Sequence, residues 1–134
     1  MVVRRRVKLF FDGGCRPNPG RIEVAVVVRG TVHFEDDLGH GTNRDAEWLA
    51  LIRALELAQA QGLTGAEFIG DAREITGQAS QALARPDEAA DRLEDGGHLS
   101  RVIALARDVR PARIRWIKRE QNLAGIALAA RHPR

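Results

Sequence analysis

Three strand-like runs follow one another before any helical pattern begins, and this order restricts the fold more than any other feature of the chain. The runs are rich in Val, Ile and Phe and cover about 3–12, 22–29 and 32–38. A turn rich in glycine, proline and asparagine separates the first two at 13–20, and a Gly-Thr pair at 30–31 can close a hairpin. Successive strands joined by short connections usually pair as neighbours, so the sequence predicts an antiparallel meander at the N-terminus.

Helical patterns alternate with single strands after residue 42. Thr42 is a suitable N-cap with Asp45 three residues later, and buried positions recur at helical spacing from Trp48 to Ala58, before Gly62. We expect the remaining elements in this order: a strand at 66–71, a helix at 73–84, a short acidic helix within 86–95, a helix at 98–109, a strand at 112–118 and a helix at 123–131. The prediction is an α/β fold with a five-stranded mixed sheet, in which the last two strands are parallel.

Length and composition indicate a globular protein. The 134 residues suit a single domain spanning 1–134, and 44% hydrophobic with 29% charged residues excludes a disordered chain. The one cysteine, Cys15, excludes an intramolecular disulfide and favours a reducing cytoplasm. No stretch approaches the ~20 apolar residues of a membrane span, and the run after Arg6 is too short for a signal sequence. We expect a cytoplasmic monomer or weak dimer without a membrane partner. The net charge of +3 mildly favours a polyanionic partner, although it also serves solubility.

Three carboxylates occupy positions at which their side chains could meet. Asp12 and Asp71 each end an apolar run, and Glu47 lies near the start of the long helix. Clustered carboxylates repel each other and make sense mainly around hard cations such as Mg²⁺ or Mn²⁺. Two such ions, about 3.5–4 Å apart, can activate water for phosphodiester hydrolysis. Each residue also has an ordinary structural explanation: an Asp-Gly turn, support of a helix N-terminus and a helix cap. Their joint arrangement favours a metal site.

Four stretches of the chain resemble motifs of the type 1 ribonuclease H family. They cover 11–20, 42–58, 68–71 and 116–129, beginning Phe-Asp-Gly-Gly-Cys, Thr-Asn-Arg-Asp-Ala-Glu, Phe-Ile-Gly-Asp and Trp-Ile-Lys-Arg-Glu-Gln-Asn. The first two are specific together, whereas the third alone is weak. The form of the fourth is closest to the shorter archaeal and plant-type members without a basic handle. The resemblance implies a ribonuclease H-like fold.

The resemblance also implies an activity. The family cleaves the RNA strand of RNA–DNA hybrids endonucleolytically with two Mg²⁺ or Mn²⁺ ions. Asp12 would bridge the ions, and Glu47 and Asp71 would complete the coordination of one of them. Residues matching or flanking the family's hybrid contacts are Gly13, Gly14, Cys15, Asn18, Asn43, Arg44 and Arg73. Structural explanations also exist for three of them: Cys15 as a small buried thiol, Asn18 as a turn former and Asn43 as part of the helix cap.

The chain departs from the family pattern at the fourth carboxylate. Four residues after Asn122 stands Ile126, where the family has an aspartate, and isoleucine cannot bind a cation. We therefore expect the second ion to be held weakly and the activity to be reduced. Glu120 is a conceivable substitute, although a solvated loop charge is its ordinary role. Arg73 follows Ala72 where a hydroxyl residue is common, and the segment 85–97 is acidic where some members carry a basic handle.

Two further functions stay open. A catalytically silent domain that binds RNA–DNA hybrid or double-stranded nucleic acid would follow if Ile126 abolishes the second metal site. A nuclease of the same fold with another substrate, such as a resolvase or an exonuclease, is disfavoured by the match of Cys15, Asn18 and Asn43 to hybrid-contact positions.

Overall fold

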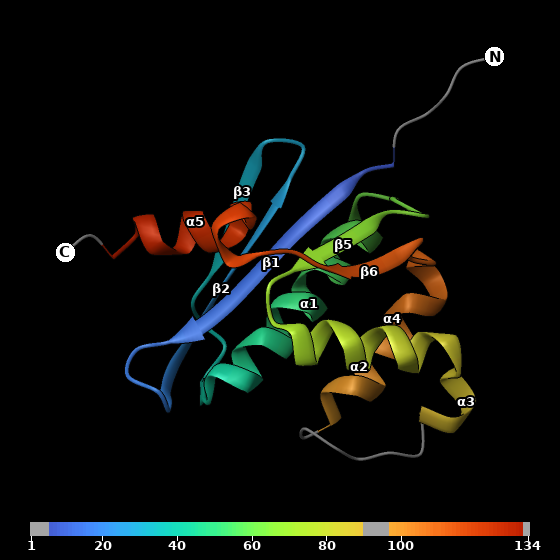
Figure 1. Ribbon diagram of the computed structural model, residues 1–134, viewed down its shortest axis with the longest axis horizontal. Helices are drawn as coiled ribbons and strands as arrows, with labels where there is room; N and C mark the ends of the chain where they lie inside the picture. The colour runs from blue at the N-terminus through green and yellow to red at the C-terminus, as the bar shows by residue number, and fades with distance from the viewer. Residues whose placement is uncertain (1–5, 90–96, 133–134) are drawn as a thin grey trace.

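The computed structural model describes residues 6–89 and 97–132 and consists of a mixed sheet with helices on both faces (Figure 1). The strands are β1 Lys8–Cys15, β2 Gly20–Val28, β3 Thr31–Glu35, β4 His40–Gly41, β5 Glu67–Gly70 and β6 Arg113–Trp116. The helices are α1 Asn43–Ala60, α2 Arg73–Ala84, α3 Pro86–Ala89, α4 His98–Val109 and α5 Leu123–Ala130, with a 3₁₀ turn at Arg119–Gln121.

The sheet has the order β3-β2-β1-β5-β6, and the two-residue β4 pairs with β2 off this path. Strands β1, β2 and β3 form the predicted antiparallel meander. Strand β5 is parallel to β1, and β6 is parallel to β5, as the intervening helices predict. The α/β fold expected from the order of elements is therefore confirmed, with β4 and the 3₁₀ turn as additions too short to leave a sequence pattern.

Strand β1 is longer at its C-terminal end than the sequence suggests. The predicted turn at 13–20 begins only after Cys15, because Gly13, Gly14 and Cys15 continue the register with β2. Asp12 consequently lies inside the strand instead of at its end. Predictions that fall on residues 3–5 and 90–96 lie outside the described residues.

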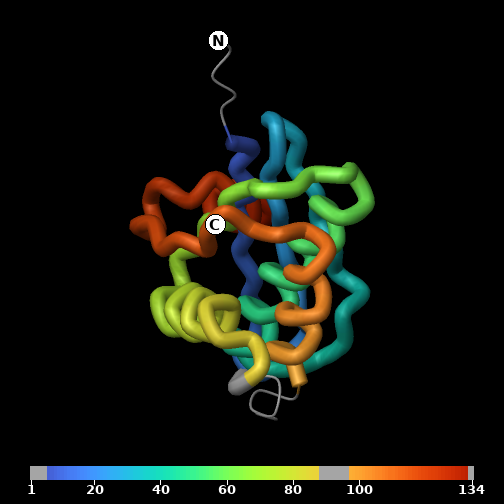
Figure 2. The backbone as a smooth tube through the Cα atoms, turned by 90° about the vertical axis from the view of Figure 1, so that its right-hand side faces the viewer, coloured from blue at the N-terminus to red at the C-terminus, as the bar shows by residue number. Residues whose placement is uncertain are grey.

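Alternation along the strands divides the sheet into two faces. One face carries Leu9, Phe11 and Phe68 and packs on α1 and α4 to form the main core around the fully buried Trp48. The other face carries Phe10, Asp12, Ala25 and Val27, and α5 covers part of it through Ala124 and Leu128. Figures 1 and 2 show α5 on the side of the sheet opposite to α1 and α4. Asp12 therefore points to the face that α5 covers.

The predicted start of α1 is confirmed at atomic detail. Thr42 Oγ1 accepts a hydrogen bond from the Asp45 N–H at 3.1 Å, and the Thr42 N–H donates to Asp45 Oδ2 at 2.9 Å. This capping box fixes where the helix begins, and it therefore fixes the position of Glu47 one turn later.

In the described part of the chain, no helix is long and apolar enough to cross a bilayer.

Gly13 lets α1 approach β1 closely. A Cβ atom at position 13 would lie 2.2 Å from the carbonyl oxygen of Ala46, which belongs to the helix backbone and cannot rotate away. A Cβ atom at the neighbouring Gly14 would meet nothing closer than Asn43 Oδ1 at 3.8 Å. The helix can therefore place Glu47 over the strand only while position 13 has no side chain.

We expect Gly13→Ala to lower the free energy of unfolding by about 2–4 kcal/mol, since the added methyl group forces strand and helix apart. Gly14→Ala is the matched control and should cost less than about 1 kcal/mol. Urea unfolding of both variants measures the difference. Equal losses would contradict the close approach at Gly13.

Candidate metal centre

Three carboxylates converge beside the C-terminal end of β5, on the face of the sheet that α5 covers. One carboxylate oxygen from each of Asp12, Glu47 and Asp71 lies within 4.8 Å of the other two. The register explains the first pair: Phe10 is opposite Ile69 on parallel neighbours, and Asp12 and Asp71 each follow by two residues. Glu47 reaches them from α1, and its Oε1 accepts a hydrogen bond from the Gly13 N–H at 2.8 Å. The sequence-predicted cluster therefore exists in space.

Burial and mutual repulsion make this cluster hold protons. Burial, followed by the nearby charge of Asp12 and a hydrogen bond to it, raises the pKa of Glu47 to about 10. Burial is also the largest effect on Asp12 and raises its pKa to about 6, although the hydrogen bond from Glu47 opposes this shift. At neutral pH the cluster thus holds a proton between Glu47 and Asp12. A bound cation would replace that proton as the compensating charge.

The donor set fits a hard divalent cation. All three side chains offer carboxylate oxygens, which Mg²⁺ and Mn²⁺ prefer, and among the described residues neither sulfur nor imidazole joins the cluster. The carboxylates line a cavity of about 600 Å³, so solvent and ligands can reach them. Asp12, Glu47 and Asp71 are therefore the residues that would hold the metal.

Asn122 orients the cluster, and the sequence interpretation did not include it among the site residues. Its side chain is fully buried, and Nδ2 donates to the Phe11 carbonyl oxygen and to Asp71 Oδ2, both at 3.0 Å. Its Oδ1 accepts from the Ala124 N–H at 3.1 Å and caps α5. A single amide thus holds Asp71 in place and fixes the start of α5. The available sequence signal was an asparagine directly before a helix.

Ile126 lines the same cavity as the carboxylates, with 51% of its surface exposed. The neighbouring Gly125 approaches them closely: a Cβ atom there would be 3.2 Å from Asp12 Oδ2 and 3.4 Å from Asp71 Oδ2. Helix α5 therefore approaches the cluster but brings no carboxylate to it. Glu120 is exposed on the 3₁₀ turn and is not part of the cluster that the described residues form.

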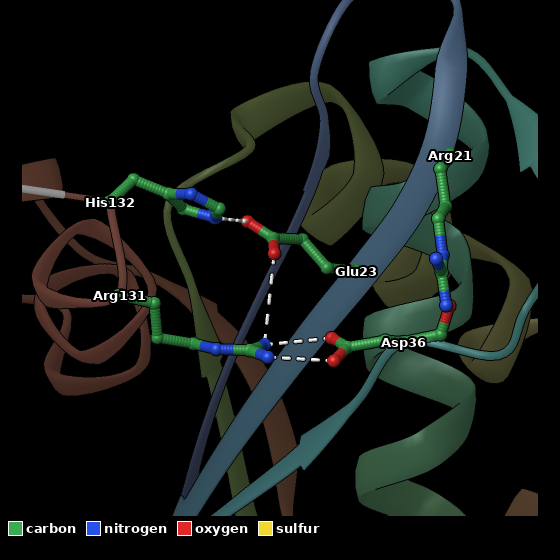
Figure 3. A network of polar contacts seen from close by, with 5 residues as sticks. All are labelled: Arg21, Glu23, Asp36, Arg131 and His132. Carbon is green, nitrogen blue, oxygen red and sulfur yellow. Dashed lines mark hydrogen bonds and ion pairs between the residues drawn. The ribbon is translucent and has the colours of Figure 1, made fainter.

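Glu23 is the one other acidic residue among the described residues that line this cavity, and it is already engaged. Its Oε1 lies 2.7 Å from His132 Nε2, and its Oε2 lies 3.7 Å from Arg131 Nη1 (Figure 3). Arg131 also forms two short contacts with Asp36, at 2.7 and 2.6 Å, and these hydrogen bonds hold the pKa of Asp36 below its ordinary value. The network anchors the C-terminal end of α5, just as Asn122 anchors its start.

Three of the expected hybrid-contact residues lie together beside the carboxylates. The Cys15 N–H donates to Asn43 Oδ1 at 3.1 Å, and the Asn43 N–H donates to Asn18 Oδ1 at 3.1 Å. Cys15 Sγ is buried 3.4 Å from both Asn43 Oδ1 and the Gly41 carbonyl oxygen. Gly13, Gly14, Cys15 and Asn43 all line the cavity. The C-terminal end of β1, the loop after it and the start of α1 thus form one polar rim.

The two expected basic contacts lie farther along the site. Arg44 pairs with Glu74 at 2.7 Å and donates to Gln78 at 3.2 Å, so its charge is partly used within the protein. Arg73 stacks over the ring of Trp116 at 4.1 Å, and the Trp116 Nε1–H donates to the Asp71 carbonyl oxygen at 3.1 Å. Trp116, which begins the fourth motif but was not expected among the site residues, is therefore a further residue beside the site.

Comparison with known proteins identifies the family. The model of the "Reverse transcriptase-like" family matches residues 10–132. The chain belongs to the type 1 ribonuclease H family. Ribonuclease HI of Halobacterium salinarum is 39% identical over 82 residues, which are 58% of this chain and 41% of that relative. The chain therefore spans about two fifths of the length of this curated relative.

Solved structures of ribonucleases H1 share the fold over nearly the whole chain. The crystal structure of RNase H1 from Halobacterium salinarum superposes with a TM-score of 0.74 at 29% identity and covers 92% of this chain and 94% of that chain. LC11-RNase H1, solved in complex with an RNA/DNA hybrid, gives a TM-score of 0.70 at 25% identity and covers 92% of this chain and 93% of that chain.

The raised pKa values predict how the cation-free ribonuclease H domain responds to pH. The unfolded chain loses the Asp12 proton near pH 3.8, and the folded protein loses it near pH 6. Folding therefore takes up protons, and stability falls as the pH rises through this interval and on toward the raised pKa of Glu47. In EDTA at pH 8, we expect Asp12→Asn to raise the melting temperature by about 3–6 °C. The gain should shrink at pH 4. Calorimetry measures both values, and a wild-type protein that becomes more stable from pH 5 to 8 in EDTA would contradict the prediction.

Proposed function

We propose that this protein hydrolyses the RNA strand of RNA–DNA hybrids endonucleolytically, with divalent cations held by Asp12, Glu47 and Asp71. The observation that carries the proposal is the convergence of the three carboxylate oxygens within 4.8 Å in an open cavity. Bound divalent cations would activate the attacking water and stabilise the leaving oxygen. The hybrid bound to the structural relative LC11-RNase H1 supports the choice of substrate.

The chain's own residues would divide the work between holding cations and holding the hybrid. Asp12 would bridge two ions, and Glu47 and Asp71 would complete the coordination of one of them. Asn122 keeps the Asp71 carboxylate aimed at the cluster through the 3.0 Å hydrogen bond to its Oδ2. The polar rim of Gly13, Gly14, Cys15, Asn18 and Asn43 is suited to the hybrid minor groove, where 2′-hydroxyls are displayed. Arg44 and Arg73 would contact phosphates at the edge of the site.

Ile126 sets the expected strength of this activity. The second ion would be bound mainly by Asp12, because α5 contributes neither a carboxylate nor a water-ordering group at position 126. We therefore expect weak binding of that ion and slow turnover. The competing function is a hybrid-binding domain without catalysis, and Ile126 is the observation that favours it.

A cleavage assay separates the two functions. We expect an end-labelled RNA–DNA hybrid to be cut internally in its RNA strand in Mg²⁺ or Mn²⁺. Asp12→Asn should slow the cut at least about 100-fold, since it removes the bridging carboxylate. Gel analysis of the products measures both position and rate. Tight binding without cleavage at any concentration of either metal would instead establish the silent binding domain.

Restoring a carboxylate at position 126 tests the role of the missing ligand. We expect Ile126→Asp to tighten divalent-cation binding and to raise the cleavage rate, each on the order of tenfold. Leu123→Asp is the matched control, because Leu123 is 47% exposed on the same helix but does not line the cavity. Titration calorimetry and the cleavage assay measure the two effects. An equal gain from Leu123→Asp, or no gain from Ile126→Asp, would show that position 126 does not face the second ion.

A further inference from the structure

The sheet face that carries α5 is left uncovered at the opposite end of its strands. At that end, a row of three paired residues crosses the sheet on this face. Lys8 of β1 pairs with Glu67 of β5, which in turn pairs with Arg113 of β6. Arg29 follows the end of β2 beside Lys8, and Arg115 lies two residues beyond Arg113 on the same face. Figure 1 shows this end of β1 extending past α5. We call Arg6, Lys8, Arg29, Arg113 and Arg115 the basic strip.

The strip concentrates the positive charge of the protein. It brings together five cations and one carboxylate, a net charge of +4, whereas the whole chain has a net charge of +3. Glu67 is buried and lies 3.2 Å from Arg113 and 3.6 Å from Arg115, so it offsets only part of that pair. Within the described residues, the strip's three other cations, Arg6, Lys8 and Arg29, form no ion pair, and all three are exposed. Their charge is available to an external anion.

The surface between these cations is shallow and partly apolar. Arg6, Lys8, Arg29 and Glu67 line a depression of about 680 Å³ together with Val7 and the half-buried ring of Phe10. Cations spaced around an accessible apolar floor suit a nucleic-acid strand, because phosphates contact the cations while bases contact the floor. A compact inorganic anion would leave most of this surface unused.

The position of the strip relative to the carboxylates indicates which part of a nucleic acid could reach it. Lys8 and Asp12 point to the same face and lie four residues apart on β1, about 13 Å along the strand. This span corresponds to about four nucleotides of a strand. Phe10 lies between them and packs against the cluster that Ala124 and Leu128 of α5 form with two β2 residues, so the helix stands above the sheet between the two places. We expect α5 to hold a rigid duplex seated on the carboxylates off this face, whereas a flexible single strand could pass the helix.

We propose that the basic strip binds a single-stranded extension of the hybrid substrate, a few nucleotides beyond the duplex held at the metal centre. The proposal rests on the proposed function for the identity of the duplex. Its own basis is the charge, shape and position of the uncovered sheet face. The strip would favour junctions between hybrid and single strand over blunt hybrids.

Binding of matched substrates tests the proposal independently of cleavage. Fluorescence anisotropy in EDTA compares a blunt hybrid with the same hybrid carrying a ten-nucleotide single-stranded extension at each of its four strand ends in turn. The strip variant is Lys8→Gln with Arg29→Gln. The control variant is Arg107→Gln with Arg110→Gln, which removes the same charge from the α4 side. Arg110 also matches Arg29 in its positive φ, 50° against 52°.

We expect at least one extension to tighten binding by the wild-type protein on the order of tenfold, with a steeper salt dependence. The strip variant should lose this gain, keep its affinity for the blunt hybrid and keep its cleavage rate on it. The control variant should keep the gain. If an extension tightens binding but no hybrid is cleaved, the proposed function is overturned and the strip proposal is supported.

Two results would overturn the strip proposal. One is that the wild-type protein binds the blunt hybrid and all four extended hybrids with equal affinity. This result would overturn the strip proposal even if the protein cleaves the blunt hybrid. The other is an equal loss in the strip and control variants, which would mean that general charge explains the gain. A third observation would reassign the face. If single-stranded extensions do not change the affinity, but poly-glutamate binds to the wild-type protein and not to the strip variant, the face is a docking surface for an acidic protein instead.

Discussion

The buried amide of Asn122 is the contact on which the geometry of the site depends. It bonds the Phe11 carbonyl oxygen of β1, the Asp71 carboxylate after β5 and the first turn of α5. An amide can donate twice and also accept, so Asn122 meets all three groups without leaving a buried polar atom unpaired. The orientation of Asp71 and the approach of Gly125 to the carboxylates both follow from this one position.

The second constraint is the close packing of α1 on β1. Gly13 permits it, and the capping box of Thr42 and Asp45 sets the turn from which Glu47 projects. These local features bring a third carboxylate next to two others despite repulsion and desolvation, which raise the pKa values of Asp12 and Glu47. A cluster of this kind could hold a metal ion, and a bound cation would offset that repulsion.

Local signals explain which parts of this arrangement are readable from the sequence. The capping box, the three successive strand runs and the carboxylates near strand ends act over a few residues or along one element, and each was predicted. Asn122 bonds a group 111 positions away, and Glu23 bonds His132 at a separation of 109. Such pairings depend on how α5 crosses the sheet, and the spacing of apolar residues in the sequence does not predict that crossing. The extension of β1 through Cys15 was missed for a related reason: Gly13 and Gly14 are typical of turns, but here they make room for α1.

We propose that Asp12, Glu47 and Asp71 bind a divalent cation that displaces the proton they share. Titration calorimetry with Mg²⁺ and Mn²⁺ at pH 7, repeated in two buffers of different ionisation enthalpy, measures binding and proton release together. We expect binding accompanied by release of a substantial fraction of a proton, and loss of both in Asp12→Asn. Absence of binding at millimolar cation, or binding without proton release, would show that the three carboxylates do not exchange a shared proton for a cation.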